Sequence, residues 1–148
     1  MNITEIKSEN IQKRKESLST FLNTNIDYID CTDEIENIFS VDNKEYLVLT
    51  FDEAFEKTKE AIKGALCYSN PEFIYIHSTL YGTDTAENCL DTIRAIQEKE
   101  DPSLVENIIK NMSSYIEDAI EIDGMGLYLA SYDCNENEQG KYLIYRIC

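Results

Sequence analysis

Hydrophobic residues recur at a roughly helical spacing in the first 22 positions of the chain, within an otherwise polar stretch. Positions three or four apart lie on one face of a helix, so the pattern predicts an amphipathic helix over residues 3–22. The helix is only thinly apolar, and we expect a peripheral element whose first half frays. Its apolar positions are Ile3, Ile6, Ile11, Leu18, Phe21 and Leu22.

The next pattern is that of a β-hairpin. Two short β-prone runs, 37–41 and 45–50, flank Asp42-Asn43-Lys44, which has the composition of a tight turn. The second run, EYLVLT, is the strongest strand pattern in the chain. We therefore expect a hairpin over about 37–50.

A helical middle follows. Thr50 and Glu53 form a capping-box pattern that starts a helix reaching about Tyr68. Asn70-Pro71 and Asp101-Pro102 each place proline directly after a polar cap, which starts a helix again. The apolar run 71–80 belongs in the core, with a strand as its alternative because it is rich in β-branched residues. The expected helices cover 51–68, 71–80, 85–99 and 102–112, with a continuation over 113–120.

The C-terminal pattern is again that of strands. Residues 127–132 and 142–147 are β-prone and flank a polar turn, so we expect a second hairpin over about 126–147. The predicted fold class is α+β. Both hairpins form one antiparallel sheet of about four strands, the second beside 45–50, with about four or five helices packed on one face. We expect a single domain, 1–148, in which the helix over 1–22 is peripheral.

Cysteine usage and hydropathy bear on location. Five cysteines at wide spacings, without a C-x-x-C pair, are typical of a reduced chain. No apolar run approaches 18 residues, so we expect no membrane contact and a cytoplasmic location, in a host cell if the protein is phage-encoded.

Charge is the unusual property of this sequence. It holds 29 acidic and 13 basic residues, a net charge of −16. Residues 16–43 and 111–140 each carry seven acids and no lysine or arginine, whereas several bases gather near the start, at Lys7, Lys13, Arg14 and Lys15. Such a chain repels nucleic acid and membrane surfaces and attracts basic proteins. A merely solubilising acidic surface is an equal alternative.

Candidate chemical sites are few. Residues from Asp133 onward resemble a calcium loop, but Glu138 stands where the loop needs glycine and Ile144 where it needs glutamate, so we reject a metal site. His77 is the only histidine and lies in an apolar run, which favours a structural role. A small enzyme using His77 and Asp123 remains an alternative. Asp123-Gly124-Met125-Gly126 is typical of a helix end, although a ligand role stays open. No cofactor is expected.

Two segments carry a resemblance to a known family. The run 123–133, with Glu136, Glu138 and the segment 142–146 after it, is similar to a DGxGxxLxxYDxxExE…YxIYR motif of small acidic proteins of unassigned function from bacteriophages and mobile elements. Residues 45–54 look like a second motif of that family. The resemblance implies an α+β fold and a phage or prophage context, and it transfers no established activity.

These observations favour a non-enzymatic inhibitor of the anti-CRISPR or anti-restriction type. Its carboxylates would act as a DNA mimic and occupy the basic groove of a host nucleic-acid-binding defence protein. An immunity protein that blocks a basic toxin, and an adaptor that forms a homodimer through its N-terminal helix, are alternatives. The candidate partner-binding residues are Glu117, Asp118, Glu121, Asp123, Asp133, Glu136 and Glu138.

Overall fold

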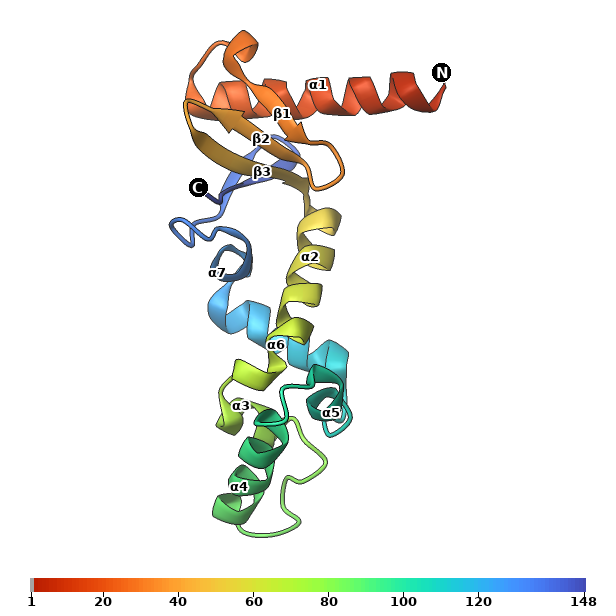
Figure 1. Ribbon diagram of the computed structural model, residues 1–148, viewed down its shortest axis with the longest axis vertical. Coiled ribbons are helices and arrows are strands. Elements are labelled where there is room, and N and C mark those ends of the chain that lie inside the picture. The colour runs from red at the N-terminus through yellow and green to blue at the C-terminus, as the bar shows by residue number, and fades with distance from the viewer. Residues whose placement is uncertain (1) are drawn as a thin grey trace. The chain divides into compact units, whose positions relative to one another are not determined.

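The computed structural model describes residues 2–148 and has an α+β fold, with seven α-helices and one five-stranded antiparallel sheet in the described part (Figure 1). The predicted fold class is therefore confirmed. The chain divides into two compact units. The first, the sheet unit, comprises the segment up to Thr58 together with Met125–Cys148, and the second, the helical unit, comprises Lys59–Gly124.

The sheet has the strand order β1-β2-β3-β5-β4, and every neighbouring pair is antiparallel. The first predicted hairpin is confirmed as β2–β3, and β5 pairs with β3 as expected, with Val48 opposite Ile144. Neither edge strand was predicted, because Asp-Cys-Thr-Asp of β1 lacks the apolar alternation of a strand and β4 lies in the segment expected to be a polar turn. The strands are β1 (Asp30–Asp33), β2 (Ile38–Val41), β3 (Lys44–Thr50), β4 (Asn137–Gln139) and β5 (Tyr142–Arg146).

Both hairpins turn on residues that tolerate a left-handed backbone. Asp42 and Asn43 have φ values of 49° and 64°, which is the geometry that a two-residue hairpin loop requires. Gly140, with φ of 60°, serves the turn between β4 and β5. The tight turn predicted at residues 42–44 is therefore confirmed.

Helix α1 (Ile3–Leu22) covers one face of the sheet, as Figure 1 shows. Asn2 caps its start in a reciprocal pair with Glu5, and Asn23 ends it in the left-handed conformation. Leu18 is fully buried in a core cluster with side chains of β2, β3 and β5. The cluster consists of Leu18, Ile29, Phe39, Val41, Tyr46, Val48, Tyr142 and Ile144. Ile29 follows the short 3-10 helix η1 (Ile26–Tyr28).

The opposite face of the sheet is also covered, which corrects the expectation that helices lie on one face only. Leu47, Leu49 and Tyr145 alternate with the residues packed under α1, so they point the other way, and all three are buried. Helix α7 (Met125–Leu129) contacts β5 on this side.

The strand predicted over 127–132 was therefore wrong. Met125, Gly126, Leu129 and Ala130 are buried while Leu127 is exposed, which is a helical rather than an alternating pattern. Tertiary packing selects the helix, because Gly126 lies against the backbone of residues 134–136, where a Cβ atom would stand 2.5 Å from the Cys134 carbonyl oxygen. The second hairpin is consequently short and consists of β4 and β5 alone.

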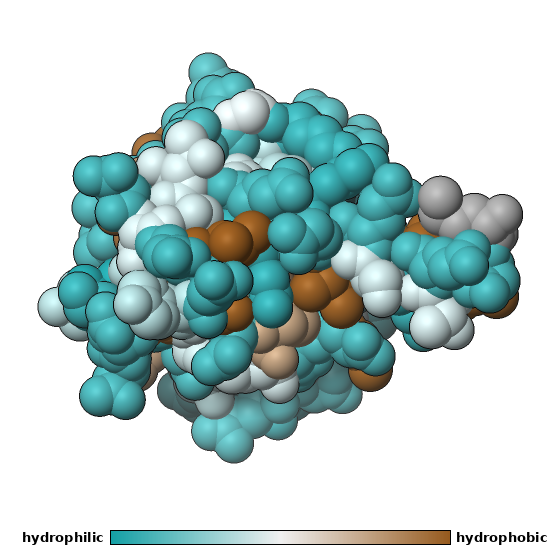
Figure 2. Space-filling model, turned by 90° about the horizontal axis from the view of Figure 1, so that it is seen from above, coloured by the Kyte–Doolittle hydropathy of each residue, from teal (hydrophilic) through white to brown (hydrophobic). Residues whose placement is uncertain are grey.

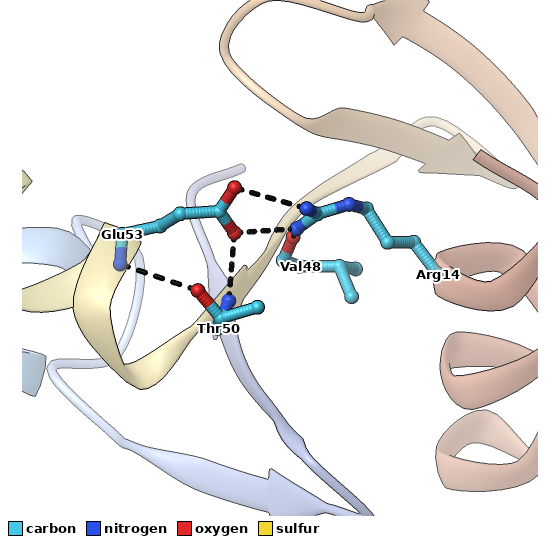
Figure 3. Close-up of polar contacts among 4 residues, drawn as sticks. All are labelled: Arg14, Val48, Thr50 and Glu53. Carbon is cyan, nitrogen blue, oxygen red and sulfur yellow. Dashed lines mark hydrogen bonds and ion pairs between the residues drawn. The ribbon is translucent and has the colours of Figure 1, made fainter. Parts of the chain in front are cut away.

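A partly buried ion pair joins α1 to the sheet and to helix α2 (Phe51–Gly64), as Figure 3 shows. Arg14 donates from Nη1 to the Val48 carbonyl oxygen at 2.7 Å. Its guanidinium also donates two hydrogen bonds, of 2.7 and 2.9 Å, to the Glu53 carboxylate. The predicted capping box is confirmed, since the Thr50 hydroxyl accepts from the Glu53 amide and Glu53 accepts from the Thr50 amide. Glu53 thus caps one helix and anchors another.

The helical unit confirms the expected helix starts, with shorter helices. Asn70 and Asp101 cap helices as predicted, and Pro71 and Pro102 occupy first-turn positions. Thr85, expected as the first residue of a helix, is the residue that caps it. The strand alternative for 71–80 is not adopted, apart from a single bridge between Ser78 and Ile109. Ile74, Ile93, Val105, Tyr115 and Ile116 are the main buried side chains. The elements are η2 (Leu66–Tyr68), α3 (Pro71–Ile76), α4 (Ala86–Gln97), α5 (Pro102–Glu106) and α6 (Met112–Asp123).

Three further properties concern residues 2–148 as a group. Within them, no helix has both the length and the apolar character needed to cross a bilayer. No cluster of three or more His, Cys, Asp or Glu side chains in this range is arranged to hold a metal ion. All five cysteines are free, with Cys67 and Cys89 buried and Cys134 and Cys148 exposed.

Candidate acidic binding surfaces

The predicted partner-binding residues fall into two groups, one in each compact unit. Glu117, Asp118, Glu121 and Asp123 lie on α6 in the helical unit, whereas Asp133, Glu136 and Glu138 lie between α7 and β5 in the sheet unit. We name them the α6 acids and the turn acids. The predicted residues thus form two acidic surfaces, one in each unit.

The α6 acids project from a helix that is anchored by its other face. Tyr115, Ile116 and Ala119 of α6 are buried, and Asn111 caps its first turn by accepting from the Ser114 amide at 3.1 Å. This packing turns Glu117, Glu121 and Asp123 toward solvent. The helix contains no basic residue.

The arrangement of the α6 acids opposes helix stability. Glu117 and Glu121 are four residues apart, and like charges at that spacing destabilise a helix. Glu121 and Asp123 lie in the last turn, where the partial negative charge of the helix dipole disfavours carboxylates by about 0.3–1 kcal/mol each. Local helix stability therefore gives no reason for Glu117 and Glu121.

Asp118 differs from its neighbours because it is half-buried beside His77. The two side chains approach to 3.1 Å between Nε2 and Oδ2 without forming a hydrogen bond, and the buried Nε2 atom has no hydrogen-bond partner among the described residues. The imidazole also packs against two rings, with centroids 4.9 Å from Phe73 and 5.3 Å from Tyr115. These contacts support the structural interpretation of His77.

Tyr115 illustrates the environment under α6. Burial raises the pKa of its phenol, a hydrogen bond with Ser69 opposes that shift, and the nearby Asp123 carboxylate adds to it. The phenol therefore stays protonated and neutral beneath the acidic helix. This arrangement keeps the negative charge of α6 on its exposed side.

The turn acids occupy three different settings. Asp133 accepts from the Asn135 amide at 3.0 Å, which shapes the turn. Glu136 accepts from the buried Tyr145 hydroxyl at 2.5 Å, and burial followed by this carboxylate raises the pKa of Tyr145 far above its ordinary range. Glu138 lies on β4 opposite Leu143 and is exposed. Two of these three carboxylates thus have structural partners.

Glu136 and Glu138 border a cavity of about 290 Å³ that the sequence did not reveal. Its apolar walls include Phe51, Met125 and Leu143, which come from α2, α7 and β5. Carboxylates beside apolar walls suit a lysine or arginine side chain, whose stem packs on apolar surface while its charge meets the carboxylates. The sequence signal for Met125 was the Asp-Gly-Met-Gly segment. For Phe51 the sequence gave no signal beyond its position at the start of a helix. Its side chain is 60% exposed.

The other base-free tract, residues 16–43, is less available for binding a partner. Asp33 accepts from the amides of Ile35 and Glu36 in the turn after β1, and the Glu36 carboxylate forms an ion pair with Lys57. Asp30 is exposed on β1, an edge strand. Charged side chains on an edge strand oppose pairing with other chains. Part of the charge segregation therefore has a structural explanation.

Comparisons of the chain with protein-family models, with curated proteins and with solved structures find no match. The function of the two acidic surfaces is therefore inferred from their own residues.

Proposed function

We propose that this chain is a non-enzymatic acidic binding protein of phage or mobile-element type. It inhibits a host nucleic-acid-binding defence protein, of the kind that anti-CRISPR or anti-restriction proteins target, by presenting a DNA-like negative surface. The observation that carries the proposal is the set of α6 acids. They stand on a helix without a base, and Glu117 and Glu121 lie four residues apart, at a spacing that costs helix stability.

The spacing of these charges supports mimicry of nucleic acid. The three exposed carboxylates, at positions 117, 121 and 123, span six helical rises, so one charge falls on roughly every 3 Å of the helix axis. Duplex DNA carries one charge on about every 1.7 Å. A groove lined with lysine and arginine would therefore meet a similar charge density on α6.

Net charge supports fast association with such a partner. The helical unit holds 13 acidic and five basic residues, a net charge of −8. Fields of this kind accelerate encounters with basic proteins and are screened by salt. The turn acids, with their cavity, offer a second site for a basic side chain.

The proposal is tested by capture on the intact chain. Bait protein is incubated with lysate of the natural host, bound proteins are identified by mass spectrometry, and their release is followed as salt rises. We expect basic nucleic-acid-binding proteins that added duplex DNA displaces and that leave between about 50 and 200 mM salt.

A triple variant, Glu117→Gln, Glu121→Gln and Asp123→Asn, should lose this capture. The matched control changes the same amount of charge at exposed positions elsewhere in the helical unit, namely Glu60→Gln, Glu98→Gln and Glu100→Gln, and should retain it. Equal capture by both variants, or binding that salt does not weaken, would contradict the proposal. A captured toxin nuclease would instead identify an immunity protein.

A further inference from the structure

His77 is the only histidine of the chain, and histidine is the one side chain whose charge ordinarily changes between pH 5 and 8. It belongs to the helical unit. The sheet unit has no histidine, and the mainly hydrophilic face around α1 in Figure 2 carries acids and bases that keep their charge in this range. His77 is therefore the side chain that responds to pH near neutrality.

The Nε2 atom of His77 is buried and faces a carboxylate without a hydrogen bond. It lies 3.1 Å from Oδ2 of Asp118, and no group of the described residues is its hydrogen-bond partner. In the neutral ring, Nε2 is either an acceptor beside another acceptor or a donor whose hydrogen is not aimed at Oδ2. A second proton makes the ring a cation, and the short distance then becomes an attraction between opposite charges. The Asp118 side chain is 50% exposed, so its carboxylate has room to turn toward the ring.

The elements packed around His77 define its electrostatic surroundings. Helix α3 contributes the Phe73 ring, and α6 contributes Asp118 and Tyr115. The segment between α5 and α6 contributes Lys110, whose amide donates to the His77 carbonyl oxygen at 2.9 Å and whose side chain is exposed. Burial raises the pKa of the Tyr115 phenol, so that group stays neutral. Burial of the imidazole opposes a charge on it, and the Asp118 carboxylate is the group that favours one.

We propose that His77 and Asp118 form a pH-sensitive switch on the acidic surface of α6. As pH falls from 8 to 5, the imidazole gains a proton and pairs with Asp118, which ties α6 to the end of α3 and cancels one of the charges of the α6 acids. As pH rises, the pair is lost and Asp118 becomes available to a basic partner. The switch stands on its own geometry, whereas its effect on binding rests on the proposed function.

Nuclear magnetic resonance of the full chain tests the switch without a partner. The single histidine gives one set of ring signals, and the shifts of its two nitrogens report protonation as pH changes. In Asp118→Asn the imidazole stays buried but loses its counter-charge, so the midpoint of its titration should fall by about one pH unit relative to the wild type. Glu117→Gln removes a charge from an exposed neighbour on α6 and should leave the midpoint nearly unchanged. Equal midpoints in the wild type and Asp118→Asn, or an equal fall in Glu117→Gln, would overturn the switch.

Binding of the captured host protein at two pH values tests the regulation. The wild type should bind about two- to fivefold more weakly at about pH 5.5 than at about pH 7.5, as the loss of one exposed charge pair implies. His77→Gln, whose fold circular dichroism verifies, and Asp118→Asn should both show less dependence on pH. The same dependence in all three proteins would overturn the regulation. Failure of the proposed function is a separate result, because it appears as capture by the triple variant of α6 and leaves the resonance test unaffected.

Discussion

The guanidinium of Arg14 holds the carboxylate of Glu53 through two parallel hydrogen bonds of 2.7 and 2.9 Å. Arg14 stands between Lys13 and Lys15 in the sequence, yet its side chain is 9% exposed while that of Glu53 is 38% exposed. Because Arg14 also donates to Val48 of β3, the pair links three elements of the sheet unit. Arginine suits this position since its planar fork matches a carboxylate.

Removing one partner of this pair should destabilise the protein. Glu53→Gln leaves the buried Arg14 charge without a counter-ion, and we expect a loss of about 2–3 kcal/mol, reduced from the value for a fully buried pair because Glu53 is partly exposed. Urea unfolding at neutral pH measures the change. Glu60→Gln, at an exposed site on α2, is the control and should change stability little.

The same pair predicts a dependence on pH. Burial would raise the pKa of Glu53, but the hydrogen bonds from Arg14 and Thr50 outweigh it, and the pKa lies below its ordinary value of 4.5. A carboxylate with a lowered folded-state pKa contributes stability above its unfolded pKa, and the contribution is lost as pH falls through the folded pKa. The difference between wild type and Glu53→Gln should therefore shrink below about pH 4.5. A constant difference down to pH 2 would contradict this assignment.

Gly126 should not tolerate a side chain. A Cβ atom there would stand 2.5 Å from the Cys134 carbonyl oxygen and 3.1 Å from the next backbone atoms, and backbone yields less readily than a flexible side chain. Gly126→Ala should cost about 1–3 kcal/mol of unfolding free energy, as overpacking does. Gly64→Ala provides the contrast, because nothing lies within 4 Å of its Cβ position at the end of α2. It should stabilise by about 0.4–1 kcal/mol, and thermal unfolding of both variants checks the opposite signs.

Neutralising an α6 acid should raise stability while it weakens binding. Glu121→Gln removes a like charge near Glu117 and a carboxylate from the helix C-terminus, so we expect a gain of about 0.3–1 kcal/mol. Glu87→Gln, in the first turn of α4, removes a favourable carboxylate and should lower stability by a similar amount. If Glu121→Gln destabilised the protein, the α6 acids would be structural and the proposed function would lose its main support.

The stability of the protein at high pH should show that the Tyr145 phenol is buried. Burial raises the pKa of Tyr145, and the Glu136 carboxylate raises it further, from the ordinary value of 10.0. The native state then keeps a proton that the unfolded state releases, so stability should fall as pH rises above about 10. Tyr145→Phe should make stability less dependent on pH in that range. The ultraviolet absorbance of phenolate and the fraction of unfolded protein are recorded together as pH rises. The comparison shows whether Tyr145 ionises only when the chain unfolds.

Local sequence signals predicted much of the fold. The caps at Thr50, Asn70 and Asp101 and the turn at Asp42-Asn43 act within a few residues, so their outcome did not depend on the rest of the chain. The pattern EYLVLT predicted the central strand, because a strand buried on both faces is apolar at nearly every position. The acidic composition likewise follows from the residues alone.

Tertiary structure determined the conformation of segments whose local sequence signals were weak or conflicting. Residues 125–129 form a helix because Gly126 fits against a backbone segment that only the fold brings near. The polar β1 is a strand because β2 offers it an edge. Contacts between distant residues also decided which charges stay exposed. Arg14 and Glu53 are 39 residues apart and neutralise each other, whereas the α6 acids have their exposure set by the packing of Tyr115, Ile116 and Ala119.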